Sequence, residues 1–598
     1  MKKNKYIGMM LMAAGLFAAT SCSDYDDYNK AVADVTPSAN QTLWENIQQN
    51  SQLSDFASLL QKAGFDDELN TTHYYTVWAP LNGTFDAAKY QAMGNGALLR
   101  QFVKNHIADY GHNATGALNE RVMMLNEKAY DFVGSSAYTF DNVQISQANL
   151  PSSNGILHTI NGVAAYYPNL YEYIMDADLS KEQGIDSLRN YFKRYETTYL
   201  DEKASVPGPI VNGMQTYVDS VMITENLLWY RLNAKLYDED STYTFLMPTN
   251  ETWETQYEKV KSFYNYIPQT SAQLFVTSGG STSINKTPAT INIDAAFWND
   301  SLTNWTLTRN LVYSNNDVYN RWIEGTPTSI GSDTLRTSVR NKLSNPQAIL
   351  SPTIEKVPMS NGYARIINAY GMYSWETYAP ERIVSAASAD NRAMISNGSF
   401  SRVEVRNPDP EKVTLEEGEN SIRYAWVEPT GGGQFVKPEM TLYLRDVLST
   451  TYEIYCVFVP ESVDPDKANA VTLPNRVIFT LNYCDVDGKL KDYTFLNEDP
   501  DQMAAFMERF NMKDNATNKN TIRSFSNDTS KVDTLYIGEF TFPVCYYGLG
   551  DEYCPNIKIT TPYSVFNASL REAYSRDLRI AGIILRPKEL AEFEESNK

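Results

Sequence analysis

Histidine is scarce in this chain, and its scarcity limits the chemistry that the sequence can carry. The 598 residues include 4 histidines, His73, His106, His112 and His158. The motifs H-E-x-x-H and G-x-S-x-G, the Walker loop and the Rossmann glycine set are all absent. His106 and His112 are spaced so that one helical face cannot hold both. The sequence therefore predicts no catalytic centre, no metal site and no cofactor.

Positive charge and long apolar runs are also scarce. With 51 basic and 72 acidic residues the net charge is −21, and such a surface repels phosphate backbones, which excludes nucleic acid as a partner. Beyond the first 21 residues, no apolar run is long enough to cross a membrane. Apolar residues at 42% nevertheless suffice for packed cores, so the length of the chain predicts about three or four folded domains.

The N-terminus has the layout of a secretory signal. Residues 1–5 contain three lysines, residues 6–19 are apolar, and small residues at 19–21 precede Cys22. A lone cysteine directly after small residues resembles the lipobox of bacterial lipoproteins, in which the thiol is lipidated. We expect 1–21 to be a signal peptide, and we expect a lipid such as palmitate on Cys22 to anchor the protein to the membrane.

An acidic run follows this cysteine. Asp24, Asp26 and Asp27 lie in the linker 22–37 and resemble the surface-export signal of outer-membrane lipoproteins in some Gram-negative bacteria. On this interpretation the protein is lipid-anchored in the outer membrane and faces the extracellular side. The alternative is that the run is a plain solvated spacer.

An internal repeat organises the first two thirds of the chain. The segment YTVWAPLNGTF at 75–85 reappears as YTFLMPTNETW at 243–253, with Tyr, Thr, Pro, Asn and Thr in register. Each copy predicts a short buried strand that ends at its proline. The asparagine that follows, Asn82 or Asn250, is suited to cap the helix that comes next.

Two further anchors repeat. Ser-Asn-Gly at 153–155 precedes a strand-like segment and recurs at 360–362, while Leu43 and Leu170 each open a Leu-x-Glu-x-Ile segment that predicts the start of a helix. Strand, Pro-x-Asn, helix and a terminal Asn-Gly hairpin strand together resemble the fasciclin domain, a compact α/β module.

The fasciclin resemblance covers 38–168 and, more loosely, 169–378. The family's best-known role is adhesion, through a site that includes a Tyr-His pair. The corresponding segment here contains Asn105 and His106, and the second copy has Asn310 followed by leucine. The adhesive motif is therefore incomplete in the first copy and absent from the second.

The second copy carries two insertions, at about 195–235 and 260–297. The Gly/Ser/Thr-rich stretch 277–287 predicts an exposed loop, and long loops are common places for binding. The alternative is that the insertions cover an interface between domains.

The last third, 379–598, has a different pattern. Many short alternating segments bounded by turn residues predict an all-β, jelly-roll-like sandwich. The expected strands are 402–405, 424–427, 441–444, 453–459, 476–482, 535–543, 557–560 and 578–585. The mostly polar segment 511–527 predicts a mobile loop. The fold class is thus multidomain α+β, with two fasciclin-like modules followed by this sandwich.

The remaining cysteines, Cys456, Cys484, Cys545 and Cys554, all lie in this last third. In an exported module four cysteines allow three disulfide pairings, and buried thiols are the alternative state.

The segment 545–554 is a candidate ligand loop. It combines Tyr546, Tyr547 and Tyr553 with two carboxylates, and glycan sites commonly stack rings on sugar faces while carboxylates bind the hydroxyls. The alternative is a tyrosine-rich turn that packs on its own sheet.

The combination of lipid anchor, acidic run and domains resembles accessory lipoproteins of TonB-dependent glycan importers. The partners implied are a TonB-dependent transporter, its surface lipoprotein and a polysaccharide, and the protein acts by binding without catalysis. The competing function is a surface adhesin or matrix-interaction protein that uses its fasciclin domains. The third interpretation is that the protein is an enzyme, and no residue pattern favours it.

Overall fold

The computed structural model of the protein describes residues 40–597 except 212, 220, 279–280, 325–333, 397, 412, 417–418, 420, 430–436, 464–471, 564 and 566. Cys22 and the acidic run Asp24, Asp26 and Asp27 lie outside the described residues. No helix in the described ranges is long and apolar enough to cross a membrane. The described residues divide into two compact units, the first within 40–173, 235–242 and 357–363, and the second within 174–234, 243–356 and 364–597.

The first repeat, 38–168, is a mixed α/β module around one sheet. Its helices are α2 (Leu43–Gln49), α3 (Ser54–Ala63), α4 (Ala87–Gln91) and α5 (Asn95–Leu98). Its strands are β1 (Tyr75–Pro80), β2 (Ile107–Asp109), β3 (Leu118–Met123), β4 (Ala129–Gly134), β5 (Tyr138–Phe140), β6 (Val143–Ser152) and β7 (Gly155–Ile160), in the order β2-β1-β7-β6-β5-β4-β3. All of β1 is buried. Because neighbouring side chains of a strand point to opposite faces, Val77 packs in the cluster of α2 and α3 while Trp78 joins Phe132 and Phe140.

The second repeat, 169–378, reproduces the centre of this sheet. Its helices are α6 (Leu170–Met175), α7 (Ala177–Gln183), α8 (Asp186–Lys193), α9 (Leu227–Arg231), α10 (Asn250–Lys261), α11 (Ala295–Thr308), α12 (Pro346–Leu350) and α13 (Ser374–Thr377). Its central strands are β12 (Tyr243–Pro248), β17 (Val312–Ser314), β20 (Thr353–Met359) and β21 (Gly362–Ile367), in the order β17-β12-β21-β20. Tyr75 stands opposite Asp109 in the first sheet, and Tyr243 stands opposite Ser314 in the second. The sequence repeat is thus also a repeat of strand order and register.

The prediction that Asn82 and Asn250 cap the helices that follow them is wrong. The side chain of Asp86 caps α4, and that of Thr249 caps α10. Asn82 Oδ1 instead accepts from the N–H of Asp55 at the start of α3, and Asn250 Oδ1 accepts from the N–H of Ser187 at the start of α8. Each asparagine therefore satisfies an orphan N–H of an earlier helix.

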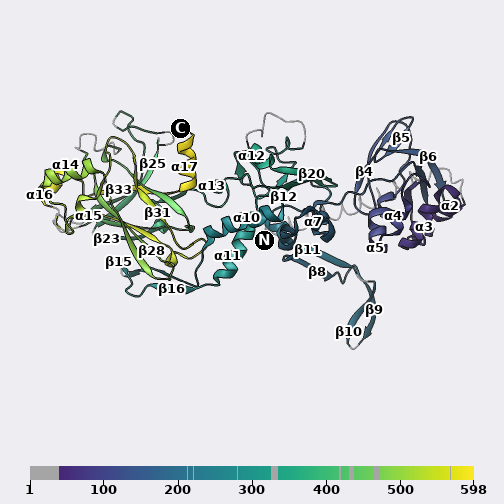
Figure 1. The fold of residues 1–598 in the computed structure, drawn as a ribbon, viewed down its shortest axis with the longest axis horizontal. Helices are drawn as coiled ribbons and strands as arrows, with labels where there is room; N and C mark the ends of the chain where they lie inside the picture. The colour runs from purple at the N-terminus through teal and green to yellow at the C-terminus, as the bar shows by residue number, and fades with distance from the viewer. Residues whose placement is uncertain are drawn as a thin grey trace, which may run out of the picture. The chain divides into compact units, whose positions relative to one another are not determined.

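The two insertions of the second repeat form different structures. The first contains β8 (Glu196–Leu200), β9 (Val206–Val211), β10 (Met214–Asp219) and β11 (Met222–Asn226), with β8 paired to β11 and β9 to β10 in a long ribbon (Figure 1). In the outer part of this ribbon, more than half of the surface of each of four apolar residues is exposed, namely Val206, Ile210, Val211 and Met214. Residues 204–218 carry no charge. Exposed apolar side chains without charge are typical of an interaction surface.

The second insertion packs against the C-terminal region. Its strands are β13 (Gln269–Ala272), β14 (Phe275–Ser278), β15 (Ser281–Ile284) and β16 (Ala289–Asn292). The Phe275 ring lies 5.9 Å from that of Tyr443, and the N–H of Ser271 donates to Cys484 Sγ. The expected loop at 277–287 is mostly a hairpin, and this insertion covers an interface, as the alternative interpretation held.

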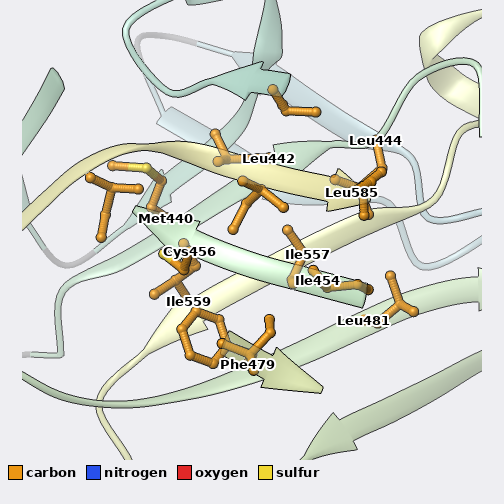
Figure 2. Close-up of a cluster of buried hydrophobic side chains, with 14 of the residues drawn as sticks. Met440, Leu442, Leu444, Ile454, Cys456, Phe479, Leu481, Ile557, Ile559 and Leu585 are labelled. Carbon is orange, nitrogen blue, oxygen red and sulfur yellow. The ribbon is translucent and has the colours of Figure 1, made fainter. Parts of the chain in front are cut away.

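The C-terminal region, 379–598, is a β-sandwich. One sheet contains β22 (Arg382–Ser385), β24 (Gly398–Arg406), β25 (Ile422–Pro429), β27 (Thr451–Phe458), β31 (Asp533–Thr541) and β33 (Leu578–Pro587). The other contains β23 (Arg392–Ser396), β26 (Glu439–Tyr443), β28 (Arg476–Cys484), β29 (Leu490–Phe495), β30 (Phe525–Ser526) and β32 (Asn556–Thr560). Alternate side chains of the two sheets fill one core, in which Ile454 and Cys456 of β27 lie among Met440, Phe479 and Ile559 (Figure 2). The expected sandwich and all eight of its expected strands are confirmed.

Several elements of this region depart from the prediction. The helices α14 (Pro500–Phe510), α15 (Lys519–Ile522), α16 (Ala568–Ala573) and α17 (Lys588–Ser596) were not expected. The expected mobile loop 511–527 is packed, because Ile522 and Phe525 are buried and Arg476 donates to the carbonyl of Ile522. Two apolar side chains in a polar segment are enough to anchor it.

Candidate binding site

A polar cavity of about 400 Å³ lies in the second repeat. This volume falls within the ~300–1,000 Å³ that is usual for ligand pockets. Four chain segments line it, namely the loop after α9, the start of β12, the end of β17, and the hairpin of β18 (Leu335–Arg336) and β19 (Lys342–Leu343). The lining residues are Asn233, Tyr243, Ser314, Asn316, Asp317, Arg336, Thr337, Ser338 and Arg340.

Strand register and one buried amide position these segments. Tyr243 and Ser314 are partners in the β12–β17 pair, so both reach the same end of the sheet. Asn320, fully buried, donates through Nδ2 to the carbonyls of Ser314 and Arg336 and accepts from the N–H of Arg336. The turn after β17 is thereby fixed to β18, and both walls of the cavity are held together.

The two arginines of the cavity differ in their contacts. Arg336 Nε donates to Asp317 Oδ2 at 2.6 Å, and its guanidinium lies 5.0 Å from the ring of Tyr319. Arg340 is exposed and forms no ion pair with any residue that the structure describes. Since the Asp317 carboxylate neutralises Arg336, one positive charge is left in the cavity.

A hydroxyl group of the cavity also lacks a partner. Ser338 is 8% exposed, and its Oγ has no hydrogen-bond partner among the described residues. Its backbone is engaged, because the N–H donates to the carbonyl of Val312 and the carbonyl accepts from Asn233 Nδ2. Buried polar atoms in folded proteins normally have a partner, so this hydroxyl is suited to bind a polar ligand.

The same place in the first repeat has different chemistry. Asp109 there stands opposite Tyr75 and contacts His73 Nε2 at 2.9 Å, while the Tyr75 hydroxyl donates to Glu68. The cavity chemistry therefore distinguishes the second repeat. Within the described ranges, no three histidine, cysteine, aspartate or glutamate side chains gather as a metal site.

The segment that corresponds to the family's adhesive motif is buried. Asn105 and His106 have no exposed surface. His106 Nδ1 lies 2.7 Å from the carbonyl of Phe102, and Nε2 accepts from the N–H of Ala164. Burial lowers the pKa of His106 to about 4. These two side chains are therefore part of the packed interior of the first repeat.

The candidate ligand loop packs largely on its own domain. Tyr546 has no exposed surface, and its hydroxyl accepts from the N–H of Cys484 at 2.7 Å. Tyr547 and Tyr553 are half-buried; the ring of Tyr547 lies 6.2 Å from that of Tyr264. The proposed stacking role of Tyr546 is wrong because both faces of its ring are covered, and the alternative of a packed, tyrosine-rich turn describes this residue.

Cys456, Cys484, Cys545 and Cys554 are all buried free thiols. Burial raises the pKa of each, to about 12 for Cys545 and Cys554. Of the two states expected from the sequence, the structure has the thiols. The candidate disulfides are not formed in it.

Comparison with known proteins supports the resemblance of the first repeat. Residues 51–165 match the family described as "Fasciclin domain". A curated relative, "Transforming growth factor-beta-induced protein ig-h3" of Sus scrofa, is 27% identical over 128 residues, which are 20% of this chain and 19% of the relative. The chain thus matches about a fifth of that relative's length. The first repeat therefore contains a fasciclin domain.

A solved structure also matches part of the chain. It is titled "Novel Fold Revealed by the Structure of a FAS1 Domain Pair from the Insect Cell Adhesion Molecule Fasciclin I" and is 13% identical in sequence. The TM-score is 0.20, and the alignment covers 55% of this chain and 99% of that chain.

Proposed function

We propose that the protein is a surface-anchored, non-catalytic binding component of a glycan uptake system, and that the cavity of its second repeat holds part of the glycan. The observation that carries this proposal is the cavity itself. Its lining of hydroxyls, amides and guanidinium groups matches the many hydroxyls of a sugar, and the free Oγ of Ser338 offers a hydrogen bond.

The rest of the proposal rests on the sequence and the family. The lipidated Cys22 and the acidic run predict an anchor at the outer surface, where a glycan can be captured before transport. The fasciclin domain at 51–165 supports a role in binding rather than catalysis. The partners would be a TonB-dependent transporter and its surface lipoprotein.

Calorimetric titration of the protein without its signal peptide against a panel of oligosaccharides tests this function. Ser338→Ala should weaken binding about five- to tenfold, because one hydrogen bond contributes about 1 kcal/mol. It should not reduce the free energy of unfolding, since the lost hydroxyl has no partner. The matched control is Thr541→Ala, an exposed hydroxyl on β31 of the sandwich. Equal affinity of Ser338→Ala and wild type for every bound sugar would contradict the cavity as the site.

Adhesion is the second candidate function. The fasciclin match favours it, as does the ribbon of β9 and β10, which exposes Ile210 and Met214. Here the partner is a protein that covers an apolar, uncharged surface.

Pulldown from solubilised outer membrane separates the two functions. Transporter subunits recovered with the wild type support uptake, whereas extracellular matrix proteins alone support adhesion. Ile210→Asp with Met214→Asp should release partners that the ribbon holds. The variant should keep the stability of the wild type, because both side chains are exposed. The glycan affinity of this variant should also be unchanged.

A further inference from the structure

We infer that the cavity of the second repeat selects an acidic sugar, a hydroxylated ring with one anionic group, and that Arg340 binds this group. The inference rests on the proposed function and names its ligand class. It follows from the charges of the cavity, the backbone of the β18–β19 turn, and the polar atoms that line the remaining wall.

The charge argument begins with Arg336. Its Nε and Nη2 lie 2.6 and 2.5 Å from Asp317 Oδ2, and Asp317 is the one carboxylate among the lining residues. This pair is internally neutral. Arg340 also lines the cavity and forms no ion pair with any described residue, in a chain whose net charge is −21. A local positive charge on a strongly acidic protein attracts an anion specifically to that place.

The backbone argument concerns the turn that carries Arg340. The N–H of Arg340 donates to the carbonyl of Thr337, and the N–H of Thr337 donates to the carbonyl of Asn341. Arg340 has φ of +71°, a conformation that suits glycine or asparagine better than arginine. The turn itself gains nothing from an arginine, and strained residues concentrate where a side chain serves a ligand.

The polar lining supplies the rest of the selectivity. A guanidinium presents parallel N–H donors that fit a carboxylate or a sulfate group. The hydroxyls of Ser338, Thr337 and Tyr243 and the amides of Asn233 and Asn316 surround the same space. A small anion has fewer atoms to bind than these groups offer. A sugar ring that carries the anion would use both sets of groups.

The test compares affinities for three oligosaccharides of equal length, one neutral, one with uronic acids and one with sulfate esters. We expect wild type to bind an acidic oligosaccharide at least tenfold more tightly than the neutral one. The preference should shrink at high salt, because it is electrostatic. Tighter binding of the uronic acid or of the sulfate ester supports the inference and identifies the anionic group.

Arg340→Gly separates binding from folding, since glycine suits the backbone of this position. It should abolish the preference for the acidic sugar and leave the melting temperature unchanged or higher. Arg340→Lys should retain part of the preference, because lysine keeps the positive charge but lacks the parallel N–H donors of the guanidinium. Arg121→Gln, which removes an exposed arginine of the first repeat, is the matched control and should behave as wild type.

The outcomes distinguish this inference from the proposed function. Equal affinity of wild type for neutral and acidic oligosaccharides would overturn the inference and leave the proposed function standing. An acidic preference that survives in Arg340→Gly would also overturn it. Binding of none of the three would contradict both.

Discussion

The side chain of Asn154 accepts a hydrogen bond from the backbone N–H of Leu43 at 2.7 Å. Its Nδ2 donates to the carbonyls of Leu69 and Thr71, so one buried amide joins the start of α2, the loop before β1 and the hairpin before β7. Asn361 makes the same set of contacts, with the N–H of Leu170 at 2.9 Å and the carbonyls of Leu236 and Asp238. The asparagine of the Asn-Gly anchor therefore closes each repeat.

Asn154→Ala should be strongly destabilising. It leaves the N–H of Leu43 and two carbonyls without their partner, and a buried unsatisfied group costs about 1–3 kcal/mol. We expect a loss of about 2–4 kcal/mol in the free energy of unfolding, measured by urea denaturation. Asn119→Ala, at an exposed position of β3, should change it by less than about 0.5 kcal/mol. A similar small effect at Asn154 would show that the amide does not close the repeat.

Lys128 is the buried centre of an ionic cluster in the first unit. Its Nζ lies 2.8 Å from Glu172, 2.5 Å from Glu239 and 3.2 Å from Ser360. Lys128→Met should cost about 3–5 kcal/mol, because it leaves carboxylates without a counter-charge. Adding Glu239→Gln should restore part of that loss, a coupling that a double-mutant cycle measures.

Lys261 and Glu258 form an ion pair in which both side chains are exposed, and this pair provides the control for Lys128. Lys261→Met should alter stability by less than about 0.5 kcal/mol, because solvent screens an exposed pair. If both methionine variants lost equal stability, burial would not be the cause.

Stability should fall as the pH drops from about 6.5 to about 4. Burial lowers the pKa of His106 and His158 to about 4, whereas an unfolded histidine has a pKa of about 6.5. Above pH 6.5 both histidines are neutral in the folded and the unfolded state, so the free energy of unfolding does not change. Below pH 6.5 the unfolded state binds protons that the folded state does not bind, and the free energy of unfolding falls. Each histidine then contributes up to about 1.4 kcal/mol of lost stability per pH unit. His106→Gln should flatten this decline, measured by urea unfolding across the window.

The four thiols of the sandwich should not react with thiol reagents in the native protein. Their raised pKa values and burial keep the reactive thiolate scarce and inaccessible. In a Cys22→Ser variant, a thiol reagent at pH 8 should label none of the four before unfolding and all four in guanidinium chloride. Mass spectrometry should find no change in mass on reduction. Labelling of the native protein, or a mass gain on reduction, would contradict the buried-thiol state.

Attachment should depend on Cys22. Cys22→Ala should leave the protein soluble in the periplasm, because the lipid would be missing. Fractionation by ultracentrifugation measures this, and persistence in the membrane fraction would refute the anchor. Replacement of Asp24, Asp26 and Asp27 with alanine should keep the anchor but reduce cleavage by external protease. Undiminished cleavage would identify the run as a spacer.

Local patterns predicted the strands well and the cavity not at all. β1, β12 and the strands of the sandwich follow from short apolar runs between turn residues, which is information within one segment. The cavity joins Asn233, Ser314 and Arg340, which come together through strand register and through the buried amide of Asn320. The positive φ of Arg340, which sets this turn apart, is seen in the structure and not in the sequence.

The predictions for Asn82, Asn250 and Tyr546 were wrong for related reasons. Asn82 and Asn250 do cap helices, but through N–H groups that lie 27 and 63 residues earlier in the chain. Inspection of neighbouring residues in the sequence does not show this relationship. Tyrosines near glycine and carboxylates indicate equally a glycan platform and a packed turn. Only the burial of Tyr546 separates the two.

The ribbon of the first insertion has edges of unequal capacity. Pro207 and Pro209 lie in β9 and supply no N–H, whereas β10 contains no proline. The two strands therefore differ in the number of backbone donors that they can offer to any neighbour. Proline is also one of the residues that make a strand a poor template for pairing with another chain, so β9 is less suited than β10 to take part in aggregation.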